Sequence, residues 1–139
     1  MLRDRVAPAL RTLGFKGSGR AFALPSDDYW ALVGFQASSF SHRAAVRFTV
    51  NLTVASRAAW AEAQKKWSCL GEKPTVGVEY SVLAGDESVL WVGRIGGLLP
   101  LGLDHWWDVQ AGSDTTNVAD EVVAAIRYYA LPAIRERMI

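Results

Sequence analysis

Residues 45–54 read AVRFTVNLTV, in which apolar and polar side chains alternate strictly. Because successive side chains of a strand point to opposite faces of a sheet, this alternation predicts a strand with one core face and one polar face. The apolar set is Val46, Phe48, Val50, Leu52 and Val54, and the polar set is Arg47, Thr49, Asn51 and Thr53. We therefore expect Phe48→Ala to destabilise the fold by about 3–5 kcal/mol and Thr49→Ala by less than about 1 kcal/mol.

Further strands are predicted on both sides of this segment. Residues 21–24 and 29–37 favour a hairpin, because the Pro-Ser-Asp-Asp stretch between them has the composition of a turn. Strands are also predicted at 89–95 and 106–110, with a weaker pattern at 76–83. The links are mostly of hairpin length, so the chain favours a mostly antiparallel sheet of about five or six strands.

Three segments space their apolar residues as helices do. Residues 3–13 form the first, which Pro8 should shorten or kink, residues 56–70 form the second, and residues 117–129 form the third, which Pro132 should break. In the second helix the buried face would carry Trp60, Ala63, Trp67 and Leu70. In the third helix the inward face would carry Val118, Val122, Ala125, Ile126 and Tyr129.

Length and composition bound the class of protein. The chain has 139 residues, 50 % of them apolar, which suits one globular domain with a sizeable core. We therefore expect residues 1–139 to form a single α+β domain, with its sheet packed against about three helices. The net charge of +1 disfavours a nucleic-acid partner, whose affinity would need a strong basic excess. No stretch is apolar enough for a membrane helix and the amino end lacks a signal-peptide core, so we expect a cytoplasmic location and no membrane partner.

Charge and tryptophan are distributed unevenly along the chain. Residues 1–71 carry ten basic and four acidic side chains, whereas residues 72–121 carry two and nine. Either the two stretches face each other in the fold, or a charged patch steers a partner. Six tryptophans are many for this length, and they would serve either in packing or as a stacking platform for a ligand.

Signatures of catalysis and of metal binding are weak. His42, His105 and Cys69 lie in no local pattern that would join a nucleophile to a base. Asp104, His105 and Asp108 are close in sequence, but they match neither the zinc-helix nor the calcium-loop spacing. The single cysteine allows no internal disulfide and no cysteine cluster. We therefore expect no catalytic residue, no cofactor and no metal, and we lean against an enzyme.

A set of polar positions provides the candidate binding residues. Gln36 ends one predicted strand, Asn51 lies on the polar face of another, and Arg94 interrupts an otherwise apolar strand. An arginine in such a strand needs a partner if it is buried, and Asp104 or another of the nearby acidic residues could supply the carboxylate. The set is either a hydrogen-bond network that fixes the register of the strands or the polar floor of a ligand cleft.

Trp106 and Trp107 complete the candidate set. Adjacent residues of a strand point to opposite faces, so one of the two rings should join the core. The other ring should be covered by a helix, exposed to solvent or part of a groove.

The same positions carry a resemblance to a known family. They are Gly14-Phe15, Phe22, Trp30 followed by Gln36 and Ser38, the run Phe48-Thr49-Val50-Asn51-Leu52, Arg94-Ile95-Gly96, and Asp104 with Trp106-Trp107. In this order and spacing the chain resembles the bacterial domain-of-unknown-function family 4304 over nearly its whole length. The resemblance implies a bacterial α+β single domain, and it implies no activity, substrate or catalytic residue.

Two functional hypotheses follow. The first is a non-catalytic bacterial binding or protein-interaction domain, similar by analogy to small immunity or regulatory proteins, whose partner is another protein or a second copy of itself. The alternative is a small enzyme or small-molecule sensor with a polar cleft near Gln36, Asn51, Arg94 and Trp106 or Trp107. If the polar side chains converge in an open concavity, the cleft is favoured; if they are buried and bonded to one another, they hold the fold together.

Overall fold

The computed structural model describes residues 1–39, 41–42, 44–83 and 85–138. A six-stranded antiparallel sheet lies at its centre, in the order β1-β2-β3-β4-β5, with β6 also pairing with β4. The strands are β1 (Lys16–Ser18), β2 (Ala21–Leu24), β3 (Tyr29–Ala37), β4 (Ala45–Ser56), β5 (Leu90–Arg94) and β6 (Trp107–Gln110). The predicted α+β architecture with a mostly antiparallel sheet is therefore confirmed.

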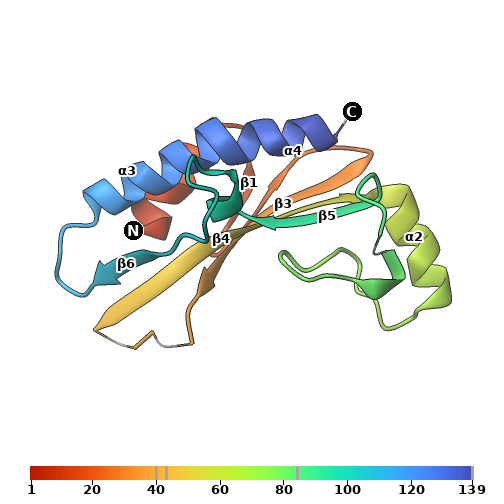
Figure 1. The fold of residues 1–139 in the computed structure, drawn as a ribbon, viewed down its shortest axis with the longest axis horizontal. Helices are drawn as coiled ribbons and strands as arrows, with labels where there is room; N and C mark the ends of the chain where they lie inside the picture. Colours follow the sequence, from red (N-terminus) through yellow and green to blue (C-terminus); the bar gives the residue numbers. More distant parts are fainter. Residues whose placement is uncertain (40, 43, 84, 139) are drawn as a thin grey trace.

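Strand β4, the twelve-residue segment built on the alternating run, holds three neighbours (Figure 1). Its whole length except the first residues pairs with β3 along one edge. Along the other edge, β5 pairs with residues 51–55 and β6 with residues 45–48. Because β5 and β6 lie end to end on one strand, the connection between them leaves the sheet; it contains the short 3₁₀ helix η3 (Ile95–Leu98).

Helices cover one face of this sheet (Figure 1). They are the π-helical turn η1 (Leu2–Val6) with α1 (Ala7–Thr12), and α3 (Thr116–Ala125), the π-helical turn η4 (Ile126–Ala130) and α4 (Leu131–Arg137), which run on from one another. The alternating apolar residues of β4 from Phe48 to Val54 are buried beneath them in the core. We call this the helix face of the sheet, and the opposite face, which carries Thr49, Asn51 and Thr53, the loop face.

Neither proline ends its helix, so the predicted break at Pro132 is wrong. The turn before it is widened, because the Leu131 N–H donates to the carbonyl of Ile126, five residues back. A π-helical turn gives room for a proline ring that would otherwise clash with the preceding turn. Pro8 follows an equivalent widened turn, η1. Tyr129, predicted to face inward, lies in η4 and is 38 % exposed.

Helix α2 (Arg57–Lys66) and residues 67–83 and 85–89 lie on the other side of the sheet from α3 and α4 (Figure 1). Ser56 caps α2 as predicted, since its hydroxyl accepts a hydrogen bond from a backbone N–H of the first turn at 3.2 Å. The predicted extension to Leu70 is wrong, because the chain turns back after Lys66 and leaves Trp67 52 % exposed. The strand predicted at 76–83 is also wrong: its last residues form the 3₁₀ turn η2 (Ser81–Leu83).

The polar row of β4 is partly buried, which corrects the expectation of a polar face: Arg47 is exposed and Asn51 is half-buried, but the two threonines are not in contact with solvent. Thr49 and Thr53 are both fully buried. The Thr49 hydroxyl donates to the carbonyl of His105 at 2.7 Å, and the Thr53 hydroxyl accepts from the N–H of Gly77 at 3.0 Å. Both threonines therefore bind segments from elsewhere in the chain, and the alternation of residues 45–54 does not reveal these contacts.

A further strand, absent from the predicted set, precedes β2. The stretch Lys-Gly-Ser-Gly-Arg at 16–20 begins as β1, which pairs with β2 at the edge of the sheet. Gly19, at a φ of +65°, makes the tight turn between the two strands.

Candidate functional site

Five of the six candidate residues form one chain of hydrogen bonds on the loop face. The Asn51 amide donates to Gln36 Oε1 at 2.7 Å, and Arg94 Nε donates to Asn51 Oδ1 at 3.3 Å. Arg94 Nη1 and the Trp106 indole N–H both donate to Asp104 Oδ2 at 2.9 Å. The guanidinium carbon of Arg94 also lies 5.2 Å from the centre of the Trp106 ring. These bonds join the positions that the sequence singles out as candidate binding residues.

The register of the sheet explains why these residues meet. Asn51 lies opposite Gly34 on β3 and opposite Arg94 on β5, so the three residues form one row across the sheet. Gln36 is two residues beyond Gly34, on the same face, and reaches Asn51 along the diagonal. Asp104 is brought to the end of this row by the connection between β5 and β6.

Asp104 is held as a carboxylate by its neighbours. The hydrogen bond from the Trp106 indole and the charge of Arg94 lower the pKa of Asp104 below its usual range, against the partial desolvation that would raise it. The side chains of Arg94 and Asp104 remain 41 % and 49 % exposed. An ion pair that keeps this much contact with water adds little to stability. The network is therefore half-exposed: it is neither enclosed in the core nor fully surrounded by solvent.

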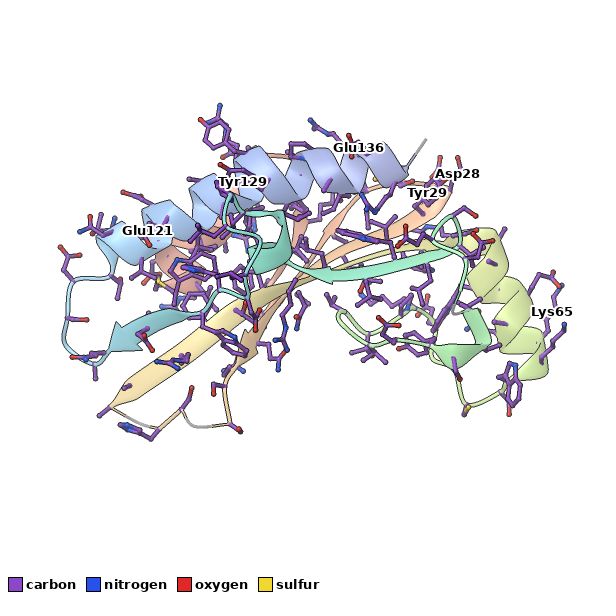
Figure 2. All side chains as sticks on the ribbon, in the orientation of Figure 1. Asp28, Tyr29, Lys65, Glu121, Tyr129 and Glu136 are labelled. Atoms are coloured by element: carbon purple, nitrogen blue, oxygen red, sulfur yellow. The ribbon has the colours of Figure 1, made fainter. Side chains whose placement is uncertain are left out.

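Trp107 does not belong to this group. It is buried on the helix face, where its ring stacks on Phe48 with 5.7 Å between centroids. Its indole N–H donates to Glu121 at 3.2 Å, and Figure 2 shows Glu121 on α3, above β6. The prediction that the two adjacent rings point to opposite faces is confirmed, and the ring beside the polar network is Trp106.

A cavity of about 680 Å³ lies on the loop face next to the network. Gln36 and Asn51 line it, whereas Arg94, Asp104 and Trp106 are not among its lining residues. Its floor is the loop face of β2 and β3, where Ala21, Ala23, Leu32 and Gly34 leave a shallow apolar surface. We call this the cationic cavity, because of the charges on its wall.

Three basic side chains line the cationic cavity: Lys16 from β1, Arg20 from the turn after it, and Lys73 from the facing segment. All three are exposed, and none forms an ion pair within the described part of the chain. No aspartate or glutamate is among the described lining residues. The amide nitrogen of Gln36 adds a further donor, since only its oxygen is bonded to Asn51. The wall therefore presents donors and positive charge with nothing to neutralise them.

The far wall of the cavity is made by residues 73–76, which are fixed to the sheet at their end. Val76 lies over Gly34, where a Cβ atom would come within 3.0 Å of the Val76 side chain. Gly77 follows at a φ of +81°, lies against Asn51, and donates its N–H to Thr53. A side chain at either glycine would push this wall away from the sheet.

Helix α2 holds the other end of the same wall. The indole N–H of Trp60 and the amide of Gln64 both donate to the carbonyl of Gly71, at 3.1 and 2.7 Å. The Tyr80 ring packs edge-on against Trp60 with 4.8 Å between centroids, and its hydroxyl accepts from the Thr75 N–H at 2.9 Å. The cavity wall is thus an irregular segment set by side-chain hydrogen bonds rather than by a strand.

Sequence reasoning missed the three basic lining residues. Lys16 and Arg20 lie between the first predicted helix and the first predicted strand, and Lys73 lies in a stretch without a repeating pattern. The one available signal was the excess of basic side chains over residues 1–71, which does not say which of them converge.

The other titratable residues suggest no further site. His42 accepts the N–H of Ala44 at 3.3 Å, and His105 packs edge-on against Trp107. Cys69 is a free, exposed thiol. Among the described residues, no three of His, Cys, Asp and Glu come together as metal ligands would. Nor does any described helix have the length and apolar character needed to cross a bilayer.

Comparison with known proteins gives a family but no activity. No curated protein matches the chain. No solved structure matches it either. One family model, described as a domain of unknown function (DUF4304), matches residues 6–136. That match takes in the whole sheet, the polar network and the cationic cavity, and the chain therefore belongs to the DUF4304 family.

Proposed function

We propose that this chain is a non-catalytic binding domain whose cationic cavity accepts a small anionic ligand. The observation that carries the proposal is the lining itself: three basic side chains without ion-pair partners, and no carboxylate among the described lining residues. Uncompensated positive charge around a concave surface raises the local concentration of anions and favours their binding. The volume of about 680 Å³ is that of an ordinary small-molecule pocket.

The polar network supports this role by fixing one rim of the cavity. Asn51 is held on both sides, by Gln36 and by Arg94, so its position and that of Gln36 are set before a ligand arrives. Such pre-organisation lowers the ordering cost of binding. Arg94 is already paired with Asp104, so it serves as support for the rim rather than as a ligand contact.

A binding role is favoured over catalysis by the chemistry of the lining. Its only hydroxyl among the described residues belongs to Thr75, and no histidine, cysteine or carboxylate is among the described lining residues to act as a base.

We also propose that the protein acts in the bacterial cytoplasm. The family that it resembles is bacterial, and an exposed, unpaired thiol at Cys69 suits a reducing compartment.

The test is ligand-dependent stabilisation with a charge-matched control. Citrate, inorganic phosphate and a nucleoside monophosphate are added in a thermal-shift series, with spermidine as the cationic control. A ligand at 100 times its Kd stabilises the fold by about 2.7 kcal/mol. We expect stabilisation by at least one anion and none by spermidine.

The variant Lys16→Gln/Arg20→Gln/Lys73→Gln should lose this stabilisation. Arg135→Gln is the control, because Arg135 is exposed on α4 and lies outside the cavity. Equal stabilisation of the triple variant and of the parent protein, or no response to any anion, would refute the proposal.

A protein partner is the second candidate, and a different surface favours it. Leu101 and Leu103, on the connection between η3 and β6, are 85 % and 68 % exposed beside Asp104. Exposed leucines next to an ion pair suit an interface with another protein or with a second copy of this chain. Sedimentation of the purified protein tests the second copy: a dimer that Leu101→Ser/Leu103→Ser dissociates would support it, and a monomer at high concentration would exclude it.

A further inference from the structure

A second cavity adjoins the cationic cavity, and Arg20 lies at their junction. This cavity has a volume of about 270 Å³ and opens on the helix face of the sheet, where β3 ends and β4 begins. Apart from Arg20, its lining is apolar: Met1, Leu2, Phe35, Ala37, Val46, Phe48 and Val109. We call it the apolar cavity. Arg20, Phe35 and Ala37 line both cavities.

The strand pairing explains how cavities on opposite faces can meet. Strand β2 pairs with β3 only as far as Gly34, so the last residues of β3 extend beyond the β1–β2 hairpin. The final link between them is the bond from the Phe35 N–H to the carbonyl of Arg20, at 2.8 Å. Past this bond, the edge of β3 that faces away from β4 has no neighbouring strand in the described part of the chain. At Ala37 the residues that line the two cavities therefore meet around this open edge, from one face of the sheet to the other.

The two cavities differ in chemistry in a way that defines a ligand. The cationic cavity offers Lys16, Lys73 and the Gln36 amide, which suit a negatively charged group. The apolar cavity offers aromatic and aliphatic side chains, among them Val46, which is 38 % exposed. Arg20 provides a charge at the boundary between the two.

We propose that the ligand of this domain is an amphiphilic anion, with its charged head in the cationic cavity beside Arg20 and a single apolar chain in the apolar cavity. The proposal rests on the proposed function, to which it adds the chemical class of the ligand. An isolated anion would leave the apolar cavity unused, and a neutral apolar molecule would leave three cations without a partner.

The experiment is a calorimetric titration with alkyl carboxylates of increasing length, namely butanoate, hexanoate and octanoate, each below its micelle concentration. Every methylene removed from water should tighten binding by about fourfold. Lengthening the chain from four to eight carbons should therefore lower Kd on the order of 100-fold. Octyl phosphate, with the same tail, shows which anionic head is preferred, and tighter binding of either head supports the proposal.

Two variants separate the head from the tail. Arg20→Gln should weaken octanoate about tenfold or more, as the loss of a charge-assisted hydrogen bond does. Val46→Trp should fill the apolar cavity and abolish the gain with chain length, so that octanoate binds no more tightly than butanoate. Val82→Trp is the matched control, since Val82 is equally exposed, at 38 %, and lines a different cavity beside α2.

The outcomes distinguish this inference from the proposed function. Anion binding that does not vary with chain length refutes the amphiphilic ligand and leaves the cationic cavity as an anion site. Octanol binding as tightly as octanoate refutes the role given to the charged head. A chain-length gain that persists in Val46→Trp refutes the placement of the tail. No binding of any of these compounds refutes the amphiphilic ligand, and the proposed function is refuted as well only if citrate, phosphate and the nucleotide also fail to stabilise the fold.

Discussion

The two faces of this sheet are built by different means. On the helix face, apolar side chains from β3, β4 and β6 pack against η1 and α1 and against the consecutive helices α3, η4 and α4. These contacts repeat with the periods of strands and helices. On the loop face, an irregular segment is held by individual hydrogen bonds, such as those of Thr53 with Gly77 and of Trp60 with Gly71. Periodic packing brings the helices close to the sheet and leaves the smaller apolar cavity at its edge, whereas individual hydrogen bonds hold the loop-face segment at a few points and leave the larger space between them. That is why the cationic cavity lies on the loop face.

The largest effect should come from the helix face. Phe48 is 6 % exposed and lies between the rings of Phe35 and Trp107, at centroid distances of 6.3 and 5.7 Å. Replacing it by alanine removes a buried ring and leaves a cavity, so Phe48→Ala should lower the free energy of unfolding by about 3–5 kcal/mol. Urea denaturation measures the change. A loss below about 1 kcal/mol, the range of surface substitutions, would show that this end of the core is open.

The loop face should give an intermediate effect through Thr49. In the structure its hydroxyl is buried and bonded to the carbonyl of His105, so the sequence-based expectation of a nearly neutral position no longer holds. Thr49→Val keeps the shape but leaves that carbonyl unsatisfied, and should cost about 1–3 kcal/mol. Thr49→Ser keeps the hydroxyl and is the control. Equal losses for the valine and serine variants would assign the cost to packing rather than to the bond.

The helix face could be predicted from the sequence because its residues obey local periods. The alternation in 45–54, the apolar run of 29–37 and the 3.6-residue spacing of the third helix each predict an element without knowledge of its neighbours. Where this reasoning failed on the same face, at Pro132, the cause was a π-helical turn, which shifts the period by one residue.

The candidate site could be predicted in part. Gln36, Asn51, Arg94, Asp104 and Trp106 were singled out because polar residues in apolar strands need partners, and the structure connects them. Residues 71–75 match no predicted element, and the strand predicted from residue 76 is absent, since a segment fixed by a few long-range bonds has no repeating pattern. For the same reason the convergence of Lys16, Arg20 and Lys73 depends on tertiary structure alone.

The polar network should respond weakly to pH. The pKa of Asp104 is lowered in the folded protein from its usual value of about 3.8, chiefly by the Trp106 indole and by Arg94. A lowered folded-state pKa means that the carboxylate stabilises the fold above the unfolded pKa, and that this stabilisation disappears as pH falls through the folded-state pKa. Because the pair is about half exposed, Asp104→Asn should cost less than about 1 kcal/mol at pH 7.

Urea unfolding of the parent protein and of Asp104→Asn at pH 7 and pH 3 measures this dependence. The difference between the two proteins should shrink on acidification, as well as in high salt. Asp27→Asn is the control, since Asp27 is exposed and makes no side-chain hydrogen bond in the described part of the chain. A difference that is unchanged at pH 3 would mean that the asparagine disturbs the network by its shape and not by its missing charge.

The smallest effect is expected at Trp67, which the helical period places on the same face as Trp60. Trp60 is 1 % exposed and holds the cavity wall through Gly71, whereas Trp67 lies just after the end of α2 and is 52 % exposed. Trp67→Ala should change the free energy of unfolding by no more than about 0.5 kcal/mol, and Trp60→Ala, measured beside it, should cost about 3–5 kcal/mol. Similar losses for both would show that α2 continues past Lys66 in solution, with Trp67 packed inside. The wall of the cationic cavity would then have to take another path, because Gly71 could not fold back to accept the Trp60 indole. This measurement of stability therefore tests the geometry on which the binding proposal depends.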